Sequence, residues 1–124
     1  MAVREKGDMK VHFYRDEHGY PRAKVPQPLE VLAWYLEQDV QGDLQWKQDV
    51  ADVMDRIQRG EIDHWEATGN AHTLLLSKEM ARIETEYADP LQSCELSQED
   101  LLQAIRDWLD FVHESFSPRT GGRK

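Results

Sequence analysis

Three side chains in one short region are of the types that bind metal ions. His64 and Glu66 precede the turn-forming pair Gly69-Asn70, and His72 follows it, so two antiparallel strands could bring the imidazoles face to face. Imidazole and carboxylate groups bind zinc, but a site needs three or four such ligands. No C-x-x-C or H-E-x-x-H motif supplies more. We therefore expect ordinary strand histidines here, with no metal and no cofactor.

Candidate nucleophiles lack the partners that would activate them. The single cysteine, Cys94, is followed by Glu95, whose negative charge disfavours the thiolate. Ser77, Ser93 and Ser97 lie outside any G-x-S-x-G motif, and Ser97 is better explained as a helix cap. The sequence therefore predicts a binding protein and not an enzyme.

Carboxylates dominate the charge of the chain and are unevenly spread. The formal net charge is −9. Residues 28–59 carry seven acids and three bases, and residues 84–114 carry nine acids and one base. This excess disfavours direct nucleic-acid binding, since phosphates require Lys and Arg. A basic protein is the natural complement. The alternative is that the acids only keep the protein soluble.

The predicted partner-binding residues are acids on the exposed sides of two helical segments, with one tryptophan as a possible anchor. They are Glu37, Asp39, Asp43, Trp46, Asp49, Asp52 and Asp55 in the first segment, and Asp107, Asp110 and Glu114 in the second. Partly exposed aromatics within acidic surroundings would suit a basic partner. The structural alternative places Trp34 against the margin of a sheet and Trp46 against the last helix.

The first segment, Pro28 to Gly60, has the largest apolar surface of the chain, with hydrophobic residues at helical spacing. Pro28 fits a first helical turn, and Gly60 is a natural stop. Gly42 interrupts the middle, and Asp43 could cap a second helix. The segment is therefore either one long helix weakened at Gly42 or two helices that meet there. A further, C-terminal helix should begin after Ser97 and end before Pro118. Asp100, three residues after Ser97, completes an N-terminal capping pattern.

Alternating residues predict an antiparallel sheet beside these helices. A hairpin is expected from 9–14 and 22–25, joined by a turn with Gly19 at positive φ. A meander is expected from 64–68, 71–77 and 80–87, whereas 88–96 is expected to be a loop. The prediction is an α+β fold with a sheet of about five strands, packed by a long or broken helix and a C-terminal helix. It assigns 1–8 to a flexible leader, 9–116 to one domain and 117–124 to a flexible tail.

Several dispersed motifs together resemble the YacL family of small bacterial cytoplasmic proteins. They are Phe13-Tyr14-Arg15-Asp16 with Gly19, Trp34-Tyr35, Trp65, Gly69, His72-Thr73-Leu74 and Glu99-Asp100-Leu101-Leu102-Gln103. The chain departs from the family at Pro28-Leu29-Glu30, where the family tends to have a His-Glu pair. The resemblance implies a cytoplasmic protein, as do the single cysteine and the lack of a long apolar run.

Size, acidity and the lack of catalytic motifs are also similar to those of bacterial immunity proteins, including those of contact-dependent inhibition. This similarity implies a protein that binds a cognate basic toxin domain, for example a nuclease, and occludes its active site. The competing hypotheses are a YacL-like housekeeping protein, which binds another component or forms a homodimer, and a small metal protein built on His64, Glu66 and His72.

Overall fold

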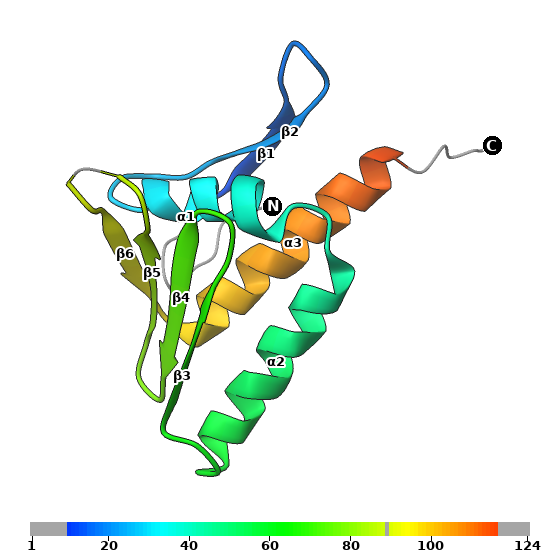
Figure 1. The fold of residues 1–124 in the computed structure, drawn as a ribbon. Coiled ribbons are helices and arrows are strands. Elements are labelled where there is room, and N and C mark those ends of the chain that lie inside the picture. Colours follow the sequence, from blue (N-terminus) through cyan, green and yellow to red (C-terminus); the bar gives the residue numbers. More distant parts are fainter. Residues whose placement is uncertain (1–9, 89, 117–124) are drawn as a thin grey trace.

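The computed structural model describes residues 10–88 and 90–116, with the side chains of 115 and 116 excluded. It shows an α+β arrangement in which helices cover one face of an antiparallel sheet and a separate hairpin projects from the same end as the first helix (Figure 1). The predicted leader at 1–8 and tail at 117–124 lie outside the described residues.

The main sheet has four strands in chain order: β3 (His64–Thr68), β4 (His72–Ser77), β5 (Ala81–Thr85) and β6 (Ser93–Leu96). Along β5, alternate residues are buried, as a sheet covered on one face requires. The hairpin of β1 (His12–Arg15) and β2 (Pro21–Lys24) forms a second sheet. The single five-stranded sheet was therefore a wrong prediction, because local alternation identifies strands but not which strands pair across a long connection.

The predicted loop at 88–96 was wrong at its end, where β6 forms the edge of the main sheet. Cys94 and Leu96 are buried and Ser93 and Glu95 are exposed, which is the pattern of a half-buried strand. Cys94 pairs with Ile83 of β5. Only four residues alternate, so the strand depends on this pairing more than on its own pattern.

The first helical segment is broken, as one of the two alternatives predicted. Helix α1 (Glu30–Tyr35) continues into η1 (Leu36–Val40), a π-helical turn, and α2 (Leu44–Gln58) follows after a sharp bend. Asp43 caps α2 by accepting a hydrogen bond from the backbone N–H of Gln45 at 3.0 Å. Gly60 has φ 78° just after the end of α2, as a terminating glycine should. Pro28 lies before α1 and not in its first turn.

Helix α3 (Gln98–Phe116) follows the predicted cap, because the hydroxyl of Ser97 accepts the N–H of Asp100 at 3.0 Å. Its apolar stripe is buried against α2 and η1, and Trp108 is only 1% exposed. Helix α1 lies across β5 and β6 and completes the core. In the described part of the chain, no helix is long and apolar enough to cross a membrane.

Candidate functional site

The π-helical turn η1 presents two carboxylates to two different sheets. Glu37 accepts the backbone N–H of Ala23 in β2 at 2.8 Å and an N–H of Arg22 at 3.3 Å. Asp39, two residues later, faces the turn between β3 and β4 instead. Their side chains are 12% and 4% exposed. The prediction that Glu37 and Asp39 lie on the exposed side of the helix was therefore wrong: both carboxylates bind other parts of the same chain.

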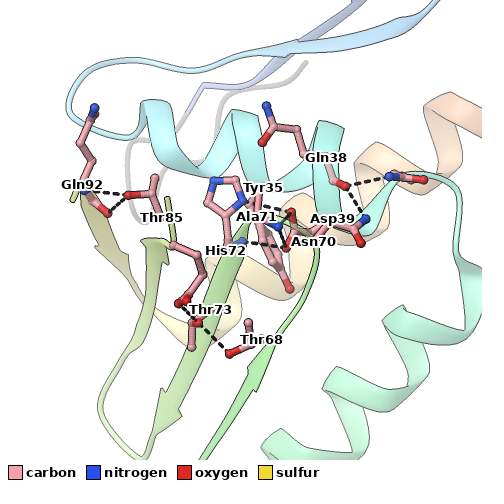
Figure 2. Close-up of polar contacts among 12 residues, drawn as sticks. Tyr35, Gln38, Asp39, Thr68, Asn70, Ala71, His72, Thr73, Thr85 and Gln92 are labelled. Carbon is pink, nitrogen blue, oxygen red and sulfur yellow. Dashed lines mark hydrogen bonds and ion pairs between the residues drawn. The ribbon is translucent and has the colours of Figure 1, made fainter. Parts of the chain in front are cut away.

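Asp39 forms a buried polar cluster together with His72 (Figure 2). Its carboxylate accepts the backbone N–H of Ala71 at 3.2 Å and that of His72 at 3.1 Å. The ring nitrogen Nδ1 of His72 lies 3.1 Å from Oδ1 of Asp39. Gly69 approaches closely enough that a Cβ there would lie 2.5 Å from Oδ2 of Asp39. The turn is thus built around this carboxylate.

The contact with Asp39 determines which nitrogen of His72 carries a proton. A carboxylate accepts hydrogen bonds, so Nδ1 is the donor, and in the neutral ring Nε2 has a free lone pair. Among the described residues, Nε2 is the buried side-chain polar atom without a hydrogen-bond partner. The ring also contacts Tyr35 edge-to-face, with centroids 5.9 Å apart. A histidine that an aspartate orients in this way can act as a general base, act as a ligand or have a purely structural role.

An aromatic group borders the other side of Asp39. The indole N–H of Trp46 donates to the hydroxyl of Tyr35 at 2.9 Å, and the Trp46 ring lies 6.0 Å from that of Trp65. Burial raises the pKa of Tyr35, and the charge of Asp39 adds to this effect. A pocket of about 180 Å³ lies between these side chains and the β3–β4 turn. Trp46 is thus partly buried against β3. The structural alternative had placed it against the last helix.

The candidate metal ligands do not meet. His64 pairs in register with Ser77 at the far end of β4, and Glu66 pairs with Leu75. His64 and Glu66 are exposed, whereas His72 is buried on the opposite face of the sheet. Within residues 10–88 and 90–114, no three potential ligands come together. The hypothesis of a metal site on these three residues is therefore wrong.

Cys94 is buried in β6 under α1. Burial raises the pKa of its thiol to about 11, and the neighbouring charges of Glu30 and Glu95 add smaller contributions. The sequence correctly predicted a raised pKa, but the main cause is burial. A thiol that remains protonated at neutral pH is a poor nucleophile.

The remaining predicted acids are exposed on the two long helices. Asp49 and Asp52 of α2, and Asp107 of α3, each accept a hydrogen bond from a glutamine amide four residues earlier, and this partner is neutral. Asp55 instead forms an ion pair with Arg59 at 3.0 Å. Asp110 and Glu114 are exposed on α3, and Asp43 is exposed where it caps α2.

The pairing of Asp39 with His72 was missed by the sequence analysis. One pattern did indicate that His72 is buried. His72 precedes Leu74 and Leu76 at two-residue spacing, so it shares their buried face. A buried histidine requires a hydrogen-bond partner. Nothing local identifies Asp39 as that partner, because the two residues are 33 positions apart.

The fold and this cluster define a small α+β protein with a buried Asp–His pair. Residues 9–104 match the family described as "Uncharacterised protein family (UPF0231)". A UPF0231 protein of Shewanella sp. strain ANA-3 is 32% identical over 103 residues, covering 68% of this chain and 81% of that protein. A UPF0231 protein of Shewanella oneidensis is 31% identical over the same shares. The chain belongs to the UPF0231 family. No solved structure matches it.

Proposed function

We propose that the protein is an acidic cytoplasmic binding protein whose partner is a basic protein domain. The observation that supports this is the group of exposed acids on α2 and α3, two helices that contact each other (Figure 1). Asp49 and Asp52 lie on α2, and Asp107 and Asp110 on α3, all of them exposed. Acidic side chains on neighbouring helices attract a basic surface and accelerate its association.

Not all of the predicted acids contribute equally to this surface. Glu37 and Asp39 are used within the fold, and Asp55 is neutralised by Arg59. The proposed surface is therefore centred on Asp43, Asp49, Asp52, Asp107 and Asp110, with the partly buried Trp46 at its margin.

In its specific form, the proposal is that the partner is a basic, nuclease-type toxin domain and that the protein occludes its active site as an immunity protein. Carboxylates on a helix surface resemble the phosphates that such a groove attracts. The family match at 9–104 favours a second candidate, a YacL-like binding protein without a toxin partner, or a homodimer. The two candidates differ in what the neighbouring gene encodes and in the partner bound.

The test is co-expression with the product of the neighbouring gene, followed by a binding assay at low and high salt. The specific form requires protection from a toxic product and binding that weakens steeply with salt. Asp49→Asn/Asp52→Asn should slow association by about tenfold, since each change removes an exposed charge. The control Glu66→Gln/Glu79→Gln removes as many exposed charges elsewhere and should have little effect. Binding that is insensitive to both salt and the α2 variant would overturn the proposal.

A further inference from the structure

The unpartnered nitrogen of His72 lies beside a small pocket that is separate from the acidic helix surface. The pocket lies between the α1–η1 segment and the ends of β4 and β5, and it has a volume of about 220 Å³. Residues that border it include Trp34, Gln38, His72, Thr85, Tyr87 and Ala88. The His72 ring rises from β4 toward α1, with Nδ1 toward Asp39 and Nε2 on the side away from it (Figure 2).

A buried lone pair without a donor is unfavourable unless another group supplies the hydrogen bond. Leaving such an acceptor unpaired costs about 1–3 kcal/mol. Thr85, the neighbouring hydroxyl in the pocket wall, is committed elsewhere: it accepts the backbone N–H of Gln92 at 2.8 Å and donates to its carbonyl at 3.3 Å. With Nδ1 donating to Asp39, the acceptor of a neutral imidazole is Nε2. No described residue donates a hydrogen bond to Nε2, which leaves this acceptor open to a group from outside them.

The walls of the pocket indicate what kind of molecule would carry that donor. Trp34 is partly buried, and the Tyr87 side chain is 81% exposed, so both aromatic surfaces are available for stacking. Apart from His72, the described lining has no ionisable side chain other than the Tyr87 phenol, so it offers no counter-charge to a charged ligand. The volume lies below the roughly 300 Å³ of pockets for drug-sized ligands.

We propose that this pocket binds a neutral, planar heteroaromatic ring whose N–H donates a hydrogen bond to Nε2 of His72. Trp34 and Tyr87 stack on the ring, and Asp39 fixes the acceptor nitrogen from behind. Nε2 itself is shielded from solvent in the unliganded protein, so the side chains around it have to shift for the ligand to reach it. The site does not depend on the acidic surface of α2 and α3.

The probes are two ring systems, each with a counterpart that lacks the donor. Uracil and indole have ring N–H groups, whereas 1,3-dimethyluracil and 1-methylindole do not. We expect uracil, indole or both to bind the full chain with millimolar or tighter dissociation constants and to shift the Nε2 resonance of His72 in long-range ¹H–¹⁵N spectra. The methylated counterparts should bind at least tenfold more weakly. Uracil binding alone would indicate a nucleobase-like ligand, and indole binding alone an indole-like one.

Two variants distinguish a loss of ligand binding from a loss of fold stability. His72→Asn retains an N–H toward Asp39 but lacks the distal acceptor, so it should lose the preference for the N–H probes. Tyr87→Ala removes one exposed wall and should weaken binding several-fold with an unchanged urea midpoint. The proposal is overturned if no probe binds, if methylated and unmethylated rings bind equally, or if Nε2 is occupied by a water molecule that no probe displaces.

Discussion

The carboxylate of Asp39 and the imidazole of His72 join the π-helical turn η1 to the start of β4 through a contact of 3.1 Å. Both side chains are almost completely buried. The same carboxylate accepts two consecutive backbone N–H groups, from Ala71 and His72, so one side chain satisfies three donors of a single turn. This contact holds the first helical segment against the sheet and also positions the pocket beside His72.

Removal of the Asp39 carboxylate should destabilise the protein more than removal of any surface acid. Asp39→Ala leaves three buried donors without an acceptor, at a cost of about 3 kcal/mol or more. Asp49→Ala is the matched control, since Asp49 is exposed and accepts a hydrogen bond from the side chain of Gln45. It should change stability by less than about 0.5 kcal/mol. Urea unfolding curves measure both. Equal midpoints would show that the cluster contributes nothing to stability.

The close approach of Gly69 to Asp39 gives a second, independent test of the same cluster. A Cβ at position 69 would meet Oδ2 of Asp39 at 2.5 Å, and that oxygen is fixed by its own hydrogen bond to the backbone. Gly69→Ala should therefore cost about 1–3 kcal/mol, as other overpacking substitutions do. Gly42→Ala is the control, because its Cβ would lie 3.7 Å from Val112 and from His113. Thermal melts that rank Gly42→Ala as the more damaging change would contradict this geometry.

Local patterns were sufficient to predict most of the secondary structure. The break at Gly42, the Asp43 cap, the Ser97 cap and the strand His64–Thr68 all depend on residues within a few positions of one another. The position of the hairpin outside the main sheet and the edge strand β6 depend on long-range pairing, which a single sequence does not specify.

The reliance on local patterns also explains why the environment of some candidate site residues was predicted correctly and that of others was not. The exposed acids of α2 and α3 follow from helical periodicity, and the structure places them on the surface. Glu37 and Asp39 belong to the same helical segment, but η1 winds as a π turn and the two sheets cover both side chains. Sequence periodicity assumes regular α-helical geometry, so it assigned these two residues to the wrong environment.

Alkaline pH should destabilise the protein through two buried acids. Burial raises the pKa of Cys94 to about 11 and also raises the pKa of Tyr35. In the unfolded chain these groups ionise near pH 8.5 and 10, respectively. The unfolded state therefore loses protons first, and stability should be constant up to about pH 8.5 and fall as the pH rises toward 11.

Cys94→Ala isolates the thiol contribution to this pH dependence. The variant should lower the urea midpoint by a fixed amount at neutral pH. Its stability should then decline less than that of the wild type between about pH 8.5 and 11, because no thiol ionises in the unfolded state. The native thiol should also react with a disulfide reagent only as fast as the protein opens, since it is buried and protonated. Rapid labelling of native Cys94 at pH 8 would contradict both expectations.

Gln41 has a backbone conformation that favours glycine, and this makes the bend after η1 a site where stability can be gained. Its φ is 51° and its ψ is −124°, and the N–H of Asp43 donates to the carbonyl of Val40 at 3.1 Å, which together define a type II′ turn. A non-glycine residue in such a conformation costs about 1–3 kcal/mol. The indole N–H of Trp108 donates to the carbonyl of Gln41 at 2.6 Å, so this turn is also tied to α3.

Gln41→Gly and Gln41→Ala should therefore differ in stability, with the glycine variant the more stable of the two. Both lose the hydrogen bond from the Gln41 amide to the carbonyl of Gln38, which is exposed and contributes about 0.5–1 kcal/mol. Only glycine relieves the strain, so the glycine variant should be more stable than the alanine variant by about 1 kcal/mol or more, after the entropy of the flexible glycine is included. Differential scanning calorimetry of the two variants checks this, and an alanine variant as stable as the glycine variant would show that the bend is unstrained.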